Sequence, residues 1–328
     1  MNIAQRINWL KWQIQLRLPG GGIYERVMAT TFNKKDLLDD ELKLFYYWLN
    51  KYEASYKTIY KGIRFTGQEI DEFYDWLDKY FLAHDKMHYT IYLDNANVIK
   101  IPVPSYEYRK HYKTQIFDLI FSYRVGYPDN IKTPFYEGPY EYSDVQVERG
   151  DVVLDVGANY GLFSAYASAK GAQVYAFEPN DELCQAYLEH TAQANPNIEI
   201  VKKAICEIVG EELFAIERTN PGESSLMGCN QDFYFGDVIK VETDTLDNFC
   251  SDLNSVDFIK ADIEGAELRL LEGAKRVIQE FKPKIALCRY HNLFDGFKIA
   301  QKIKKIDPSY QIEHKWMKTY AYSHKKSR

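Results

Sequence analysis

Residues 151–177 combine two patterns of apolar and polar positions. Residues 152–156 form a short, almost continuous apolar run with β-branched side chains, which is typical of a strand buried on both faces of a parallel sheet. Apolar side chains then recur at helical spacing over 162–169, and a second apolar run fills 174–177. Together these patterns predict one β-α-β unit.

The chain beyond this unit predicts more elements of the same two kinds. Asn180 is suited to cap a helix that ends before Asn195-Pro196. Later patterns predict strands at 198–201, 256–262 and 283–287, helices at 265–281 and 298–306, and an antiparallel pair at 310–312 and 319–322. The fold class is therefore α/β, with a Rossmann-like, mostly parallel sheet and an antiparallel last strand. The polar stretch 218–236 is interpreted either as a mobile lid or as a plain surface loop.

The N-terminal third has a different pattern. Apolar residues at helical spacing predict helices within 1–20, 35–60 and 67–86. Residues 88–103 alternate around Asn95-Ala-Asn97, which predicts a hairpin. We therefore expect residues 1–104 to form a mainly helical accessory region that ends in this hairpin. Residues 105–140 would connect it to a sheet domain over 141–328.

Two glycines separate the first strand of the sheet from its helix. Gly157 and Gly161 flank Ala158, Asn159 and Tyr160, so the backbone can turn sharply and approach a ligand closely. An acidic residue, Glu178, follows the second strand, 21 residues after Gly157. That is where an acid at a strand end receives ribose hydroxyls in nucleotide-type sites. The segment therefore predicts a cradle for a cofactor that contains a ribose.

The glycine turn does not match a dinucleotide fingerprint, because the third glycine is missing. Asp155, just before the turn, would repel a phosphate but could attract a cation. S-adenosylmethionine has a ribose, an adenine, a sulfonium and an ammonium group but no phosphate, so it is the predicted cofactor. An NAD site and an ordinary glycine turn in a sheet protein are the alternatives.

A second group of polar residues follows the later strands. Asp262 and Glu264 come after one strand and His291 after the next, and parallel strands present their carboxyl ends at one edge. We expect these side chains to face the same crevice as Gly157. His291, with a reference pKa of about 6.5, suits the role of general base. Asp262 and Glu264 could orient an acceptor, act as base, or share a divalent cation with Asp295; Lys260 is a further candidate base.

Three separated motifs, Asp155–Gly161, Phe177–Asn180 and Asp257–Glu267, resemble the FkbM family of S-adenosylmethionine-dependent methyltransferases. The resemblance covers roughly residues 140–323, and Tyr290-His291 followed by an Asp fits it. It implies a class I methyltransferase fold, and an acceptor hydroxyl on a sugar, polysaccharide or secondary metabolite. It also implies that the turn at Ala204 lies beside the adenine. The predicted cofactor-binding residues are Asp155, Gly157, Ala158, Asn159, Gly161, Glu178, Pro179, Ala204 and Asp262, and we expect no metal ligand.

Composition narrows the partners and the compartment. The net charge of −6 argues against non-specific nucleic-acid binding. Five scattered cysteines without a CxxC pair suggest a reducing cytosol, and no apolar run approaches the roughly 20 residues of a membrane span. We expect a cytoplasmic enzyme whose N-terminal helices are candidates for docking or homo-oligomer formation. The alternative functions are an NAD-dependent oxidoreductase and a catalytically silent scaffold in polysaccharide assembly.

Overall fold

The computed structural model describes residues 82–84, 88–92, 98–102, 115–116, 119, 139–217, 221–229, 237–291 and 294–323. The helices predicted before residue 82 lie outside these ranges. Residues 82–84, predicted as the end of a helix, instead form strand β1 (Leu82–His84). Pairing with the next strand prevails there over the helical spacing of the apolar residues.

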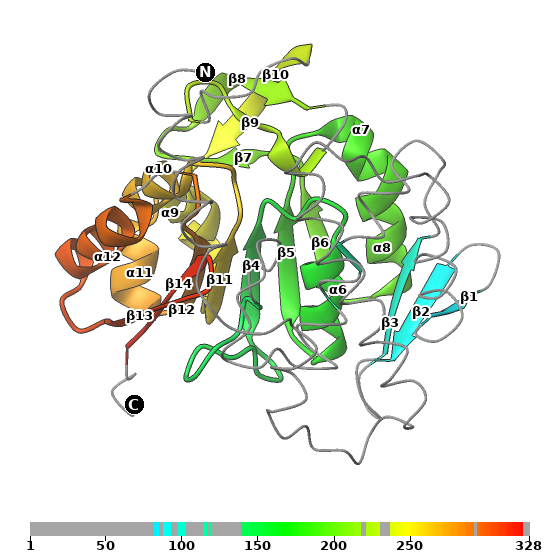
Figure 1. Ribbon diagram of the computed structural model, residues 1–328, viewed down its shortest axis with the longest axis horizontal. Coiled ribbons are helices and arrows are strands. Elements are labelled where there is room, and N and C mark those ends of the chain that lie inside the picture. Colours follow the sequence, from blue (N-terminus) through cyan, green and yellow to red (C-terminus); the bar gives the residue numbers. More distant parts are fainter. Residues whose placement is uncertain are drawn as a thin grey trace, which may run out of the picture. The chain divides into compact units, whose positions relative to one another are not determined.

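A seven-stranded sheet forms the centre of the described fold (Figure 1). Its strands are β4 (Val152–Val156), β5 (Gln173–Phe177), β6 (Ile198–Val201), β11 (Phe258–Ala261), β12 (Lys284–Cys288), β13 (Gln311–Lys315) and β14 (Lys318–Tyr322). The spatial order is β13-β14-β12-β11-β4-β5-β6. Strand β14 runs antiparallel to both of its neighbours, whereas β4, β5, β6, β11 and β12 pair in parallel. The prediction of a mostly parallel sheet with an antiparallel last strand is confirmed.

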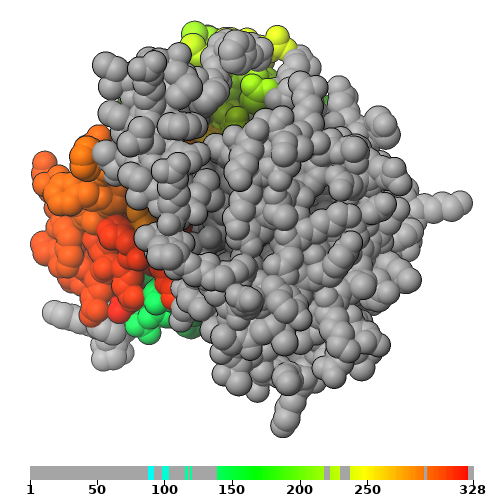
Figure 2. All heavy atoms as spheres, viewed as in Figure 1, coloured from blue at the N-terminus to red at the C-terminus, as the bar shows by residue number. Residues whose placement is uncertain are grey.

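Helices follow the strands and bury their apolar residues against the sheet. They are α6 (Leu162–Ala169), α7 (Asp181–Leu183), α8 (Glu189–Ala194), α9 (Leu246–Phe249), α10 (Glu267–Glu272), α11 (Lys275–Phe281) and α12 (Asp295–Ile306). A π-helical turn, Cys184–Leu188, joins α7 to α8. The main apolar core unites β4, β11 and β12 with α10, α11 and α12. In Figure 2, α12 and the last two strands form the orange and red part of the surface.

Two helices differ from their predicted bounds. The single helix expected over 265–281 is divided into α10 and α11 at Gly273. A side chain at Gly273 would overlap the carbonyl oxygen of Cys206, and its own carbonyl accepts a hydrogen bond from Asp247 N at 2.9 Å. Gly273 therefore packs closely against Cys206 and Asp247, and the helix is interrupted at this residue. Helix α12 begins at Asp295, three residues before the expected start.

A second, four-stranded sheet was not predicted. Its strands are β7 (Ala204–Ile205), β8 (Gly210–Ile216), β9 (Ser225–Leu226) and β10 (Asp237–Asp244), in the order β7-β10-β8-β9. Part of the stretch 218–236 thus forms β9 and a 3₁₀ turn, Pro221–Glu223, while 218–220 and 230–236 lie outside the described residues. The lid stays a hypothesis.

The predicted hairpin is present as β2 (His88–Tyr92) and β3 (Val98–Pro102), paired antiparallel. Asn195, at the end of α8, holds it through its side chain, which donates to Lys100 O at 2.6 Å and accepts from Lys100 N at 3.5 Å. The hairpin therefore packs beside α8. The domain boundaries at 104 and 140 stay predictions. In the described ranges we find no helix with both the length and the apolar character needed to cross a membrane.

Candidate active site

The glycine turn after β4 is fixed by neighbouring backbone. Gly157 N and Ala158 N both donate to Phe177 O, at 3.1 and 2.9 Å. Gly157 has a φ of +74°, and a side chain there would overlap the carbonyl oxygen of Asp262. Close packing against the protein's own backbone thus requires the glycine, and the approach of a ligand to this turn stays a prediction. The turn is attached to the ends of both β5 and β11.

Glu178 lies directly beside this turn. Its carboxylate is buried and accepts hydrogen bonds from Asn159 N at 3.1 Å and Asn180 N at 2.9 Å. Burial raises the pKa of Glu178 to about 7, although these two N–H donors act in the opposite direction. The side-chain oxygen of Asn159 is buried and has no hydrogen-bond partner. A fixed carboxylate and an unsatisfied amide oxygen are suitable acceptors for ribose hydroxyls.

A pyrophosphate fits this turn poorly. Dinucleotide sites present free N–H groups of the turn and the following helix to the phosphates. Here the N–H groups of Gly157 and Ala158 are bonded to Phe177, that of Asn159 to Glu178, and that of Gly161 to Ala158 O. These four N–H groups are therefore not available to a phosphate, and the polar groups beside the turn fit a cofactor that contains a ribose, as S-adenosylmethionine does.

Asp155 has a different setting from the predicted one. It is fully buried, accepts from Ser164 Oγ at 2.6 Å, and pairs with the ammonium group of Lys260 at 2.9 Å. Its charge is therefore balanced within the protein, and the expectation that it attracts a cofactor cation loses its basis. Lys260 also donates a hydrogen bond to Gly157 O at 2.6 Å, which connects this ion pair to the glycine turn.

Lys260 is poorly suited to be a base. Burial by itself would lower the pKa of Lys260, but the carboxylates of Asp155 and Asp262 outweigh burial and raise it. The amine therefore keeps its proton at neutral pH. We assign Lys260 to the support of the turn.

The other predicted cofactor residues occupy varied positions. Ala158 is buried within the turn, and a side chain at Gly161 would overlap Leu188, so both serve the packing of the turn. Pro179 is half-buried next to Glu178. Ala204 is buried in β7, within the four-stranded sheet, and its place beside an adenine stays a prediction.

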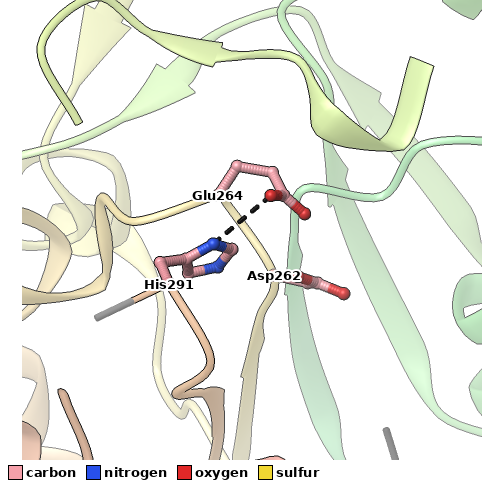
Figure 3. A group of neighbouring side chains, drawn as sticks. All are labelled: Asp262, Glu264 and His291. Atoms are coloured by element: carbon pink, nitrogen blue, oxygen red, sulfur yellow. Dashed lines mark ion pairs between the residues drawn. The ribbon is translucent and has the colours of Figure 1, made fainter. Parts of the chain in front are cut away.

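Asp262, Glu264 and His291 come together at the ends of β11 and β12 (Figure 3). One polar atom from each lies within 4.8 Å of the other two. Glu264 and Gly265 both have positive φ values, of 53° and 99°, which turn the chain sharply after Asp262. Three atoms at this spacing can all be reached from one point at about 2.8 Å, an ordinary O–H···O distance. The cluster could therefore surround one hydroxyl oxygen; coordination of a cation is the other chemistry open to these groups, and the expectation of no metal stays a prediction.

Two tyrosines hold Asp262 in place. Tyr140 Oη donates to Asp262 at 2.6 Å, and Tyr290 Oη lies 2.9 Å from Asp262 and 3.1 Å from Glu264. Burial acts to raise the pKa of Asp262, but the charges of Lys318 and Lys260 outweigh it and hold that pKa well below its usual range. Asp262 is thus a rigid, ionised carboxylate.

Sequence reasoning missed Tyr140 and Lys318. Lys318 is completely buried in β14, and its ammonium group lies 4.2 Å from the centre of the Tyr140 ring. Neither residue belongs to a recognisable motif. Lys318 is the first residue of its strand and is followed by Thr319, so the local sequence does not indicate that its side chain is buried.

His291 is enclosed by carboxyl groups. Its side chain is 5% exposed, with Nδ1 3.4 Å from Glu264 Oε2 and Nε2 3.8 Å from Glu267 Oε1. Burial lowers the pKa of His291, so the ring is neutral at pH 7. A neutral imidazole has one lone pair that can take a proton.

The two halves of the site adjoin. The contact of Gly157 with the Asp262 backbone places the glycine turn directly against the loop that carries Asp262 and Glu264. The sheet edge therefore brings together the predicted donor and acceptor regions.

The sequence is similar to those of known methyltransferases. The Methyltransferase FkbM domain family profile matches residues 155–322. Methyltransferase sdnD of Sordaria araneosa is 28% identical, over 40% of this chain and 63% of that protein. Hexuronic acid methyltransferase AglP of Haloferax volcanii is 26% identical, over 41% of this chain and 54% of that protein. The chain thus spans less than two thirds of the length of these relatives.

The chain also resembles a solved methyltransferase structure. A crystal structure of methyltransferase FkbM from Methylobacillus flagellatus shares 24% identity and has a TM-score of 0.41, covering 58% of this chain and 46% of that one. The family profile spans the glycine turn, the acidic cluster and His291, and extends to β14. This chain belongs to the FkbM methyltransferase family.

Proposed function

We propose that this protein transfers a methyl group from S-adenosylmethionine to a hydroxyl oxygen of a sugar, polysaccharide or secondary-metabolite acceptor. The observation that carries the proposal is the glycine turn, whose N–H groups are bonded to Phe177 and Glu178. The bonded N–H groups of this turn and the acceptors beside it support a ribose site better than a phosphate site. The hydroxyl-sized cluster of Asp262, Glu264 and His291 lies against it.

The donor half is formed by residues at the ends of β4 and β5. Glu178 and the free side-chain oxygen of Asn159 would accept the ribose hydroxyls. S-adenosylmethionine supplies an activated methyl group carried on a sulfonium. The protein's contribution is position, because holding the two reactants in line can account for roughly 7 to 11 kcal/mol of a barrier.

The acceptor half must orient a hydroxyl and take its proton. Asp262, ionised and held by two tyrosines, is suited to orient the hydroxyl. His291, neutral at pH 7, is suited to take the proton, a contribution of roughly 10² to 10⁴ in rate. Glu264 faces both groups and would stabilise the imidazolium that forms.

The class of acceptor is supported by one relative. AglP is a hexuronic acid methyltransferase, and hexuronic acids are sugar acids that carry several hydroxyls. The five cysteines in the described ranges are free, which is in keeping with a reducing, cytoplasmic location. We include this location in the proposal, and we propose that the protein has no nucleic-acid partner. An NAD-dependent oxidoreductase and a silent scaffold are the functions against which the proposal is tested.

Calorimetry on the full chain tests the donor half. S-adenosylhomocysteine is expected to bind and NAD to give no heat, because the N–H groups of Gly157, Ala158, Asn159 and Gly161 are already bonded within the protein. Binding of NAD with no signal from S-adenosylhomocysteine would reject the proposal.

Transfer of a labelled methyl group to sugars with free hydroxyls tests the acceptor half. His291→Ala should bind S-adenosylhomocysteine as the parent does, yet transfer the label about 10² to 10⁴ times more slowly. An unchanged rate in this variant would exclude His291 as the base. If no acceptor is labelled although the cofactor binds, the scaffold function gains support.

A further inference from the structure

Glu267 is a buried acid that the proposed reaction does not use. It is the first residue of α10, and its side chain is 4% exposed. One carboxyl oxygen, Oε1, accepts a hydrogen bond from Ile263 N at 3.2 Å and lies 3.8 Å from His291 Nε2. A carboxyl group rarely occupies such a position without a partner to which it responds.

We propose that Glu267 is a positioning residue for His291. Its carboxylate receives the Nε2–H of the ring and leaves Nδ1 as the atom that takes the acceptor's proton. The inference rests on the proposed function only in the identity of the proton donor; the arrangement of the ring can be tested without any acceptor.

The geometry gives the two ring nitrogens different neighbours. Nδ1 faces Glu264, on the side where the cluster with Asp262 could surround a hydroxyl oxygen (Figure 3). Nε2 faces Glu267 and has no hydrogen-bond partner. In a neutral imidazole the hydrogen bond made by one nitrogen decides the state of the other. A partner at Nε2 therefore fixes the tautomer with a lone pair on Nδ1.

The separation of 3.8 Å is longer than a formed hydrogen bond. Catalytic hydrogen bonds are often long in ligand-free enzymes and shorten when the complex forms. Ile263 N already holds Oε1 in the direction of the ring. A small rotation of the imidazole is therefore enough to close the contact.

The surrounding charges and burial set the protonation of the two groups. Asp262 and Asp295 act on both groups, Glu264 faces Nδ1, and Lys318 is the nearby cation that acts on His291. Burial raises the pKa of Glu267 to about 8 and lowers that of His291. Above about pH 8, Glu267 is therefore a carboxylate beside a neutral ring, which is the form that can accept Nε2–H.

The proton balance of the step is complete. As the bond between the acceptor oxygen and the methyl carbon forms and the bond between sulfur and that carbon breaks, the hydroxyl proton passes to Nδ1. The sulfonium becomes a neutral thioether, and the ring becomes an imidazolium whose second N–H points to Glu267. The carboxylate then stabilises the new charge.

Nitrogen NMR of ring-labelled histidine in the full chain, saturated with S-adenosylhomocysteine, tests the inference. His291 is assigned by its loss in the His291→Gln spectrum. In the parent at alkaline pH we expect Nε2 to carry the proton. In Glu267→Ala the tautomer preference should disappear, whereas Glu267→Gln, whose amide oxygen can still accept, should retain it. The ionisation of Glu267 should also appear as a change in the His291 nitrogen signals near pH 8, and Glu267→Gln should abolish this change, because its amide does not ionise.

Glu272→Gln, a half-exposed position on the same helix, is the matched control and should change neither property. If Glu267→Ala does not fold, the signal change near pH 8 decides, because it should be present in the parent and absent in Glu267→Gln. A parent-like tautomer in Glu267→Ala, or a change near pH 8 that persists in Glu267→Gln, overturns the inference. Failure of S-adenosylhomocysteine to bind the parent would count against the proposed function instead, and the spectra of the unliganded chain would then decide on Glu267.

Discussion

At the residue scale, Glu178 combines a proposed role in cofactor binding with unfavourable burial of its carboxylate. Its pKa of about 7 lies above the value of about 4.5 that an unfolded chain would show. A raised acid pKa means that the folded protein holds more protons than the unfolded one between these values. The contribution of Glu178 to stability therefore falls as the pH rises from about 4.5 to above 7.

Binding of the cofactor should depend on pH in the opposite sense. Ribose hydroxyls donate to the ionised carboxylate, and with a pKa of about 7 only about a tenth of Glu178 is ionised at pH 6. We expect the affinity for S-adenosylhomocysteine to rise about tenfold between pH 6 and 8, measured by calorimetry. Glu178→Gln should bind about 1.5 to 3 kcal/mol more weakly and lose this pH dependence.

The exposed Glu182→Gln is the matched control and should retain the parent's affinity and pH profile. A pH dependence that persists in Glu178→Gln would assign the titration to another group. An affinity that does not change with pH in the parent would contradict the contact between Glu178 and the ribose.

Single-residue roles could be predicted only where sequence spacing fixes position. Glu178 follows a strand at a characteristic distance from Gly157, and the structure places it beside the turn. The partner of Asp155 could not be predicted, because Lys260, which pairs with it, lies more than a hundred residues away in the sequence. The pairing depends on the parallel register of β4 and β11, which opposes these two residues directly.

At the element scale, strands that are buried on both faces were predicted well. Residues 152–156 and 258–261 consist largely of apolar side chains, and the pattern alone identifies them. Strand β8 was missed because its burial pattern is mixed. Its first four residues are exposed or partly exposed, and its buried apolar residues occur only near its end. The division of α10 from α11 depends on the approach of Cys206 to Gly273, which no local pattern shows.

Attachment of the hairpin to α8 depends on one side chain, Asn195. It is buried and bonds both polar backbone groups of Lys100 as well as Thr191 O. Asn195→Ala should reduce the free energy of unfolding by about 1 to 3 kcal/mol, because it leaves buried backbone groups unsatisfied. Urea denaturation measures this change, and hydrogen exchange should become faster over 98–102.

The exposed Gln185→Ala removes a hydrogen bond to Asp181 in the helical segment before α8 and serves as the control. Its effect should stay within about 0.5 kcal/mol. If Asn195→Ala were equally mild, the hairpin would be held mainly by its apolar contacts.

At the scale of the whole molecule, the site is a property of the central sheet. The glycine turn, Glu178, Asp262 and His291 follow β4, β5, β11 and β12, which are neighbours in the sheet. Parallel strands collect their carboxyl ends at one edge, so motifs spread over more than a hundred residues meet there. The positions of these residues at strand ends could be predicted from the sequence pattern, whereas the enclosure of His291 by Glu264 and Glu267 required the three-dimensional structure.

Removal of residues 1–20 tests whether the N-terminal region is accessory. The groups proposed to hold the cofactor all come from residues 155–262, and their hydrogen bonds join them to one another or to the sheet. A chain that begins at residue 21 should therefore bind S-adenosylhomocysteine within about twofold of the full chain by calorimetry, since these hydrogen bonds join residues of the sheet domain to each other. We expect the truncation to change the oligomeric state, the membrane association or the use of the acceptor. Light scattering would detect a change in oligomeric state, and methyl transfer would detect a change in the use of the acceptor. Loss of cofactor binding in a truncated chain that remains folded would show that the accessory boundary is wrong and that the N-terminal segment completes the site.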